Sequence, residues 1–336
     1  MYSLIRPLLF SLPPERAHHI TLATLNTLEK LHLAHFLFGT NTASKPQTVM
    51  GITFPNALGL AAGLDKNADY VDGLGALGFG FIEVGTITPR PQSGNPQPRL
   101  FRLPKKNALI NRMGFNNAGV ETLIANVKKQ QYKGILGINI GKNFDTALEN
   151  AVDDYVICLE KVYPYADYIT VNISSPNTPG LRTLQHGDEL NVMLAKLKLT
   201  QLALQKQHDR YVSIAVKIAP DMDEDAIYAV ANALIEHDID GVIATNTTLE
   251  RTAVQGLNHA DEQGGLSGAP LTEKSTEVIK QLHTALAGKL PIIAVGGIQS
   301  AADAQAKLDA GASLVQIYTG LVYQGPALVK NILRSL

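Results

Sequence analysis

From residue 56 onward, the chain alternates two kinds of segment. Short apolar, β-branched runs end in glycine, asparagine, threonine or lysine, and each is followed by a stretch with apolar residues at three- and four-residue spacing. The first pattern predicts buried parallel strands, and the second predicts amphipathic helices. The eight predicted strands span residues 57–63, 81–87, 134–141, 168–174, 212–219, 241–247, 291–297 and 314–320.

Eight strand–helix units are the number that closes a parallel barrel. A doubly wound open sheet is the structural alternative, but such a sheet gathers its polar residues at one switch point. In this chain, polar residues follow the ends of nearly all the strands. We therefore predict an α/β protein with a (β/α)₈ TIM barrel over residues 41–336 and a small N-terminal helical extension over residues 1–40.

The N-terminal extension carries only five charged side chains among many leucines and phenylalanines. This pattern predicts two short amphipathic helices. Pro14 and Glu15 resemble a helix start, and Gly39 followed by Asn41 resembles a helix end. Two interpretations fit: a helical lid packed on the barrel, or a helix pair that dips an apolar face into lipid headgroups without spanning the membrane. The pattern alone favours the lid.

Composition narrows the classes of function. The chain has 29 Lys and Arg against 30 Asp and Glu, a net charge of −1, so we expect no nucleic-acid partner. The single cysteine, Cys158, cannot form an internal disulfide, and we interpret it as a core residue. No apolar run approaches the ~18 residues of a membrane span. The histidines of the extension lack cysteine or carboxylate companions at ligand spacing, so we expect no metal site.

Polar side chains at the strand ends point to an active site. The carboxyl ends of the strands form the face on which barrel enzymes build their sites. Three connections, 88–117, 175–189 and 248–270, are too long for simple turns, and such loops usually cover or build a site. The strand-end residues are Lys66, Thr86, Asn139, Asn172, Lys217, Thr245, Asn246 and Tyr318.

A series of motifs in these regions closely resembles the dihydroorotate dehydrogenases. The resemblance runs from about residue 45 to 336. It implies a (β/α)₈ barrel that binds FMN at the carboxyl ends of its strands and oxidises dihydroorotate to orotate in pyrimidine synthesis. The motifs are AAGLDK (61–66), NRMGFNN (111–117), GINIGKN (137–143), NISSPNTPGLR (172–182), VKIAPD (216–221), IATNTT (243–248), GGLSG (264–268), VGGI (295–298) and IYTG (317–320).

The resemblance also implies which residues hold the cofactor. Gly268, Gly297 and the turn at 318–319 look like phosphate contacts, because glycine lets backbone N–H groups approach phosphate oxygens closely. Lys217 is expected to place a cation where negative charge grows as the flavin takes up a hydride. The full set for FMN is Ala62, Gly63, Lys66, Thr86, Asn139, Asn172, Lys217, Thr245, Gly268, Gly297, Tyr318 and Thr319.

Orotate is planar, with amide-like edges and a carboxylate, so its site needs donors, acceptors and a positive neighbour. The resemblance places the catalytic base at Ser175. A serine hydroxyl is a poor base by itself and must pass its proton onward, with Thr178 as one candidate relay. The residues implied for the substrate are Lys66, Asn111, Arg112, Met113, Gly114, Phe115, Asn172, Asn177, Asn246 and Thr247.

The residue at position 175 indicates the class within the family. Relatives that use fumarate or a nicotinamide carry cysteine there, so Ser175 points to the quinone-linked class. That class bears an N-terminal helical extension that forms an apolar tunnel for the quinone tail, with His18, Arg102 and Tyr318 as lining groups. The resemblance thus favours a membrane-dipping extension over a plain lid.

The implied protein is a peripheral one on the cytoplasmic face of the bacterial inner membrane, bound through residues 1–40, with a monomer as the working expectation. Two alternatives stay open at this stage. One is a lysine-dependent TIM-barrel aldolase that uses Lys217 or Lys66. The other is a non-catalytic, membrane-docked scaffold.

Overall fold

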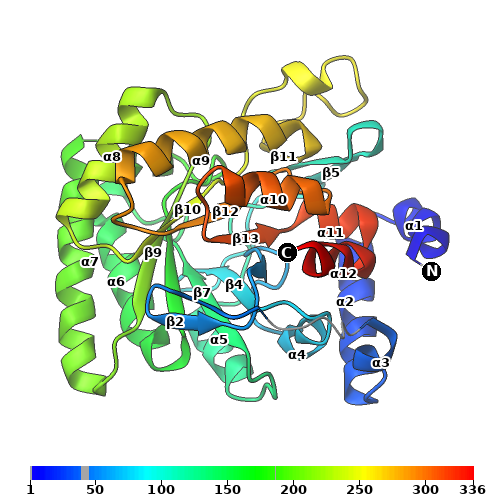
Figure 1. Ribbon diagram of the computed structural model, residues 1–336, viewed down its shortest axis with the longest axis horizontal. Helices are drawn as coiled ribbons and strands as arrows, with labels where there is room; N and C mark the ends of the chain where they lie inside the picture. The colour runs from blue at the N-terminus through cyan, green and yellow to red at the C-terminus, as the bar shows by residue number, and fades with distance from the viewer. Residues whose placement is uncertain (1, 39–44, 186) are drawn as a thin grey trace.

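Eight parallel strands close into a barrel, as the sequence pattern predicts (Figure 1). The structure is a computed structural model that describes residues 2–38, 45–185 and 187–336. Neighbouring strands follow their order in the chain, and the last strand pairs with the first, which excludes the open sheet. The barrel strands are β3 (Leu58–Leu60), β4 (Phe81–Ile87), β7 (Ile135–Ile140), β8 (Tyr168–Asn172), β9 (Ser213–Ile218), β10 (Gly241–Ala244), β12 (Ile292–Val295) and β13 (Leu314–Ile317).

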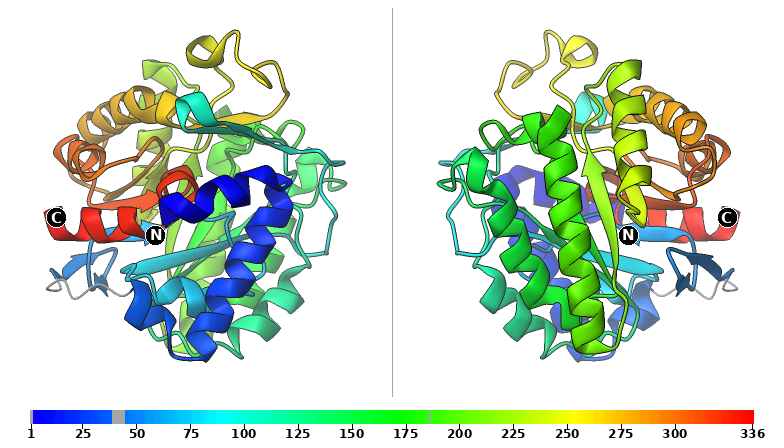
Figure 2. Two further views of the ribbon diagram at one scale, coloured as in Figure 1. Left: turned by 90° about the vertical axis from the view of Figure 1, so that its right-hand side faces the viewer. Right: turned by 90° about the vertical axis from the view of Figure 1, so that its left-hand side faces the viewer.

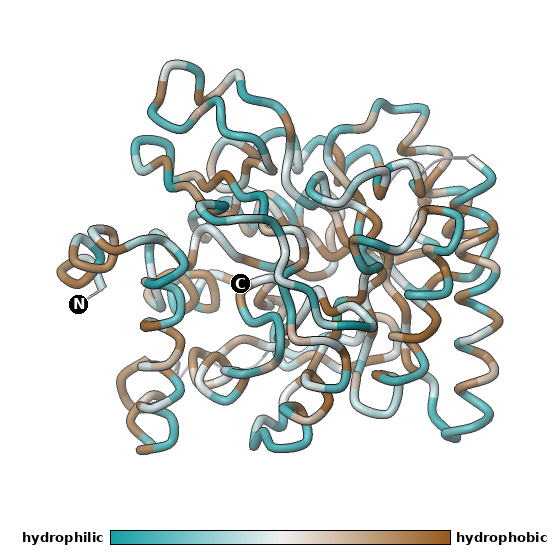
Figure 3. The backbone as a smooth tube through the Cα atoms, turned by 180° about the vertical axis from the view of Figure 1, so that it is seen from behind, coloured by the Kyte–Doolittle hydropathy of each residue, from teal (hydrophilic) through white to brown (hydrophobic). Residues whose placement is uncertain are grey.

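Helices surround the barrel and cover its outer face (Figures 1 and 2). Each of the longer ones turns an apolar stripe inward, and Figure 3 shows this periodicity as alternating brown and teal along the helices. In α8 (Glu224–Glu236), the stripe is Ile227, Val230, Ala231 and Leu234. The other helices outside the N-terminal extension are α4 (Val71–Gly75), α5 (Val120–Val127), α6 (Ala151–Val162), α7 (Gly187–His208), α9 (Thr272–Leu286), α10 (Ala301–Asp309), α11 (Thr319–Gln324) and α12 (Pro326–Ser335).

A hairpin closes the amino-terminal end of the barrel. Strands β1 (Gln47–Val49) and β2 (Ile52–Phe54) pair antiparallel, and the ring of Phe54 contacts that of Phe81 at a centroid distance of 5.0 Å. The strands of the barrel begin around this apolar plug. Because one end is sealed, a ligand can enter the barrel only from the carboxyl ends of the strands.

Two of the long connections form a small sheet at the open end, which the sequence pattern did not reveal. Strands β5 (Leu100–Leu103), β6 (Ala108–Asn111) and β11 (Gly265–Gly268) pair antiparallel in the order β11-β6-β5. Each is only four residues long, so the alternation expected of a strand had no length in which to appear. The sheet forms one wall above the barrel.

Three helices make up the described part of the N-terminal extension, where two were predicted. They are α1 (Tyr2–Ser11), α2 (Pro14–Lys30) and α3 (Ala34–Phe38). The start at Pro14 is confirmed, and α3 is separate because the chain turns at His32, whose φ is 57°. The predicted end at Gly39 and Asn41 lies outside the described residues.

The extension is held to the rest of the fold by specific polar contacts. Glu15 in α2 forms an ion pair with Arg99 at 3.0 Å, and both side chains are largely buried. Arg102 in β5 donates hydrogen bonds to the carbonyl oxygens of Phe10 and Leu12, at 3.1 and 2.9 Å. Among the described helices, none is both long and apolar enough to cross a bilayer.

Candidate active site

A cavity opens at the carboxyl ends of the barrel strands, and most of the predicted site residues meet there. The strands end at one level, so the residues that follow them converge even though they are far apart in the sequence. The predicted residues that line this cavity are Ala62, Gly63, Lys66, Thr86, Asn111, Met113, Gly114, Phe115, Asn172, Ser175, Asn177, Lys217, Thr245, Asn246, Thr247, Gly268, Gly297, Tyr318 and Thr319.

Asn139 is fully buried and supports the wall of the cavity from behind. The hydroxyl of Thr86 donates a hydrogen bond to Oδ1 of Asn139 at 2.5 Å. Nδ2 of Asn172 in turn donates to Oγ1 of Thr86 at 3.0 Å. Thr86 and Asn172 are therefore held in fixed orientations where β4 and β8 end.

Glu83, which the sequence analysis did not single out, places a carboxylate inside the barrel. It is 1% exposed and accepts hydrogen bonds from Asn139 at 2.8 Å, Tyr168 at 3.0 Å and Gln316 at 2.8 Å. These bonds offset the cost of burying the charge. The only signal in the sequence was one charged residue within the apolar run FIEVGTI.

Two lysines, the partly buried Lys66 and the buried Lys217, give the cavity positive charge. Burial, followed by the nearby charge of Arg99, lowers the pKa of Lys66 to about 8. Burial also lowers the pKa of Lys217, while the charge of Glu83 opposes that shift. Neither ammonium group has a hydrogen bond or an ion pair with any residue that the structure describes. Cations that are largely withdrawn from water and have no partners favour an anionic or electron-rich ligand.

The turn after β12 allows close approach of a ligand to the backbone. Gly296 and Gly297 have φ values of 120° and 76°, a region that suits glycine. A Cβ on Gly297 would lie 2.3 Å from Cα of Thr272. Both amide atoms of the Gln299 side chain, which also lines the cavity, are buried without a partner in the described residues. This corner suits a ligand rich in oxygen atoms, such as a phosphate.

Ser175 lies on the loop after β8 and faces the cavity. Its Oγ accepts a hydrogen bond from the backbone N–H of Asn177 at 3.2 Å. Nδ2 of Asn177 donates to the carbonyl oxygen of Asn111 at 3.2 Å, which ties this loop to strand β6. Ser175 is only 5% exposed, so a proton on its hydroxyl is largely shielded from bulk water.

Arg112 lies outside the lining of this cavity, although its neighbour Asn111 is part of it. The guanidinium forms an ion pair with Glu262 at 2.7 Å and donates to the carbonyl oxygen of Pro98 at 2.9 Å. It also stacks 4.7 Å from the ring centre of Phe101. In this geometry, Arg112 ties together the loops above the cavity.

The three residues predicted for a quinone tunnel occupy different places. His18 lines a second cavity beneath α2, and burial, with the charge of Lys66, lowers its pKa to about 3. Arg102 stacks on Phe10 of α1 at 4.6 Å. Tyr318 lines the main cavity. Lys66 lines both the main cavity and the cavity that His18 lines.

Comparison with known proteins identifies the family. A family model described as dihydroorotate dehydrogenase matches residues 45–336. The chain belongs to the dihydroorotate dehydrogenase family. The sequence resemblance is thereby confirmed, and membership of this oxidoreductase family removes the grounds for an aldolase or a non-catalytic scaffold.

Relatives within the family match over almost their whole length. The dihydroorotate dehydrogenase (quinone) of Janthinobacterium sp. (strain Marseille) is 59% identical, with 100% of this chain and 98% of the relative covered. That of Cellvibrio japonicus is 61% identical, with 98% and 96% covered. Among solved structures, DHODH from Eimeria tenella in complex with ferulenol has a TM-score of 0.84 and 36% identity, with 95% of this chain and 89% of that one covered.

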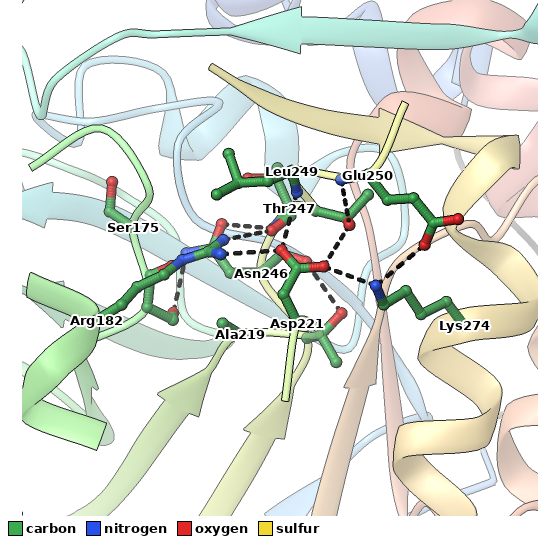
Figure 4. A network of polar contacts seen from close by, with 12 residues as sticks. Ser175, Arg182, Ala219, Asp221, Asn246, Thr247, Leu249, Glu250 and Lys274 are labelled. Atoms are coloured by element: carbon green, nitrogen blue, oxygen red, sulfur yellow. Dashed lines mark hydrogen bonds and ion pairs between the residues drawn. The ribbon is translucent and has the colours of Figure 1, made fainter. Parts of the chain in front are cut away.

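Asp221 joins three segments around the site (Figure 4). Its carboxylate pairs with Arg182 at 2.9 Å and Lys274 at 2.8 Å. It also accepts hydrogen bonds from the hydroxyl of Thr248 at 2.5 Å and the N–H of Leu249 at 2.9 Å. Burial alone would raise the pKa of Asp221, but these bonds outweigh it and hold the pKa below its ordinary value.

Arg182 extends this network to the loop that carries Ser175. Its Nε donates to the carbonyl oxygen of Ser174 at 3.1 Å, and its Nη2 donates to that of Thr247 at 2.8 Å. Arg182 and Asp221 stand inside recognised motifs, but only their spatial arrangement reveals that they connect two loops of the site. The sequence analysis had assigned neither of them a role.

Replacing Asp221 should destabilise the protein, because the Asp221→Asn variant leaves Arg182 and Lys274 without their shared charge partner. Loss of such charge-assisted bonds costs about 1.5–3 kcal/mol, and we expect Tm to fall by about 3–6 °C. Asp145→Asn is the matched control, since the Arg90–Asp145 pair is exposed; it should shift Tm by less than about 1 °C. Equal shifts in thermal unfolding of the two variants would contradict the assigned importance of the network.

Proposed function

We propose that this chain oxidises dihydroorotate to orotate in the barrel cavity, with FMN as its cofactor and a membrane quinone as the electron acceptor, as a step of pyrimidine nucleotide synthesis. The observation that carries the proposal is the meeting of Ser175 with Lys66 and Lys217 in one cavity. A hydroxyl that can receive a proton lies with two cations that can hold negative charge. The printed names of the bacterial relatives add the quinone.

The residues present fit an FMN molecule. The unpaired cations, the glycine turn at 296–297 and the partnerless amide of Gln299 all call for a ligand with a charged, oxygen-rich end. When bound, FMN supplies the hydride acceptor. In this assignment, Lys217 would supply a fixed positive charge to the flavin, and Gly268 and Gly297 would leave room for its phosphate.

Heat-denatured protein provides the test of the cofactor. The supernatant should contain FMN, identified by mass, in an amount that approaches one per chain. Release of FAD or riboflavin instead, or the absence of flavin from a folded protein that does not bind added FMN, would contradict the proposal.

The substrate-binding residues come from three loops that the fold holds together. Asn111 and Asn177 are connected by a hydrogen bond at 3.2 Å. Asn246 donates to the hydroxyl of Ser174 at 3.0 Å. Among the described residues, Nδ2 of Asn111 and Oδ1 of Asn177 have no hydrogen bond, so a donor and an acceptor are available for the edge of a planar pyrimidine. Met113, Gly114 and Phe115 form the neighbouring wall of the cavity.

Ser175 is assigned the role of base that takes the proton from C5 of dihydroorotate. Within the described residues, no carboxylate or imidazole bonds to its hydroxyl, and no hydrogen bond joins it to Thr178. The proton therefore leaves Ser175 through water or by a movement of the loop. Because the hydroxyl is largely buried, the rate at which the proton leaves Ser175 depends on the protein and not on direct exchange with bulk water.

The N-terminal extension is assigned to quinone capture at the membrane. Eight of the sixteen large apolar side chains exposed in the described residues belong to α1–α3 or the turn between α2 and α3. Leu4, Leu8 and Phe36 are 83%, 70% and 85% exposed. Exposed apolar side chains of this kind suit contact with lipid acyl chains. We place the protein, as a monomer, on the cytoplasmic face of the bacterial inner membrane, with the quinone reaching the flavin past His18, Arg102 and Tyr318.

The charge of Lys66 predicts a pH dependence of orotate binding. With a pKa of about 8, Lys66 is cationic below that pH and attracts the orotate carboxylate; above it, the charge and the attraction are lost. The Kd for orotate, measured from the perturbed flavin spectrum, should be constant between about pH 6 and 7 and rise about tenfold by pH 9. In Lys66→Arg, which stays charged, the rise should vanish. The same rise in Lys66→Arg would assign it to another group.

A further inference from the structure

Lys307 is a fully buried cation outside the residues assigned so far. It lies in α10, is 0% exposed, and reaches the first turn of α9. Its Nζ donates to the carbonyl oxygen of Thr272 at 2.8 Å, to Oγ of Ser275 at 2.6 Å and to Oγ1 of Thr276 at 2.6 Å. All three donors of the ammonium group are therefore used, and every acceptor is neutral.

No carboxylate balances the charge of Lys307 within ion-pair distance among the described residues. Asp303 is the acidic residue that influences it most, but its carboxylate accepts hydrogen bonds from Gln299 and Ser300 at the start of α10. Burial lowers the pKa of Lys307 to about 7. A buried charge in this position is costly unless an anion approaches it.

The contacts of Lys307 lead directly to the corner of the cavity formed by the glycine turn. Ser275, which Lys307 contacts, donates to the carbonyl oxygen of Gly296 at 2.9 Å. Thr272 donates from its hydroxyl to the carbonyl oxygen of Gly297 at 2.7 Å. Gly296 and Gly297 line the cavity. One residue thus separates the buried ammonium group from the backbone that faces a ligand.

The other lysine of this helix turn, Lys274, does not supply the same charge. It pairs with Asp221 at 2.8 Å and with Glu250 at 3.1 Å (Figure 4). Its positive charge is already balanced by these two carboxylates. Lys307 is therefore the cation behind this turn whose charge remains available to a ligand.

We propose that Lys307 is a positioning residue that makes the cavity select a phosphorylated flavin. Its charge lies behind the Gly296–Gly297 turn and attracts a phosphate dianion held on the other side, without touching it. Attraction between opposite charges acts across several ångströms of protein interior. The hydrogen bonds to α9 also keep the turn in place. This inference rests on the proposed FMN-dependent function.

The test compares flavins with and without the phosphate. Full-length protein is freed of flavin, and the Kd for FMN and for riboflavin is measured by fluorescence quenching. In Lys307→Met and in Lys307→Gln, which retains a polar side chain, we expect the Kd for FMN to rise about ten- to hundredfold. The Kd for riboflavin should stay within about threefold, because riboflavin has no phosphate to attract.

Two control variants separate charge from local packing. Thr276→Val removes one hydrogen bond of Lys307 but keeps its charge, so the ratio of the two Kd values should stay within about threefold of the wild-type ratio. Lys280→Met removes an exposed charge from α9, the helix that Lys307 contacts, and should leave both Kd values unchanged. Lys307→Arg keeps the charge and should keep the preference for FMN.

The outcomes separate this inference from the proposed function. Equal weakening of both flavins in Lys307→Met and Lys307→Gln, or no weakening of either, would overturn the role of Lys307 even though FMN binds. Loss of the FMN preference in Lys307→Arg would also overturn it, and that variant decides the matter if the uncharged ones do not fold. If the wild-type protein binds neither flavin, the proposed function itself fails.

Discussion

Ser175→Ala should retain its flavin and bind orotate, but dihydroorotate should reduce it at least about 10²–10³-fold more slowly near neutral pH. A positioned general base contributes about this much to a proton transfer, and the variant removes only the hydroxyl. The cavity and the loop should persist, because Arg182 and Asn177 hold that loop through bonds to other atoms. The measurement is the rate at which visible flavin absorbance disappears after anaerobic mixing with dihydroorotate.

Ser175→Cys is the informative companion of this variant. A thiol has a lower pKa than a hydroxyl and becomes a better base as pH rises toward about 8.5. Ser175→Cys should therefore react faster than Ser175→Ala, and its rate should increase with pH over this range. A Ser175→Ala variant that reduces its flavin at the wild-type rate would remove Ser175 from the mechanism.

Replacing two exposed apolar residues of the extension, as in Leu8→Asp with Phe36→Asp, should detach the protein from membranes. Each side chain loses about 1.5–3 kcal/mol of burial in lipid, so we expect liposome binding to weaken at least about tenfold. The measurement is co-sedimentation with vesicles of phosphatidylethanolamine and phosphatidylglycerol. Turnover with a long-chain quinone in those vesicles should fall in parallel, whereas reduction of the flavin by dihydroorotate should be unchanged.

Helix α7 offers a matched control for this variant. Val192 and Leu199 are 65% and 67% exposed, and α7, which carries them, lies on the opposite side of the barrel from α1–α3 (Figure 1). Val192→Asp with Leu199→Asp adds the same charge, yet it should leave liposome binding and quinone turnover intact. If both double variants lose binding equally, charge repulsion and not the apolar side chains of α1–α3 governs the association.

The barrel could be predicted from the sequence because its strands are buried on both faces. A run such as IIAV in β12 is buried along its whole length and is therefore apolar at every position, and this constraint marks the strand clearly. The small sheet β5-β6-β11 has no such constraint, because its four-residue strands lie between turns. The third helix of the extension depends on one residue, His32, with a left-handed backbone, and a side chain gives little warning of that conformation.

The candidate site was predicted as a set of motifs, and the structure refines it residue by residue. A contiguous motif does not tell which side chains face the cavity: Asn111 does, whereas the next residue, Arg112, binds Glu262. Glu83 and Lys307 could not be found in this way, because their partners come from distant segments. Glu83 and Lys307 matter because each is a charged side chain that is fully buried, and burial is known only once the fold is known.

The anaerobic half-reactions of the full-length protein test the central claim most directly. Dihydroorotate should abolish the visible flavin absorbance, and a short-chain quinone should then restore it within the time of a single mixing experiment, while fumarate and NAD should not. Flavin that dihydroorotate does not reduce, or reduced flavin that reacts with fumarate or NAD as fast as with quinone, would contradict the assignment of this barrel to quinone-dependent dihydroorotate oxidation.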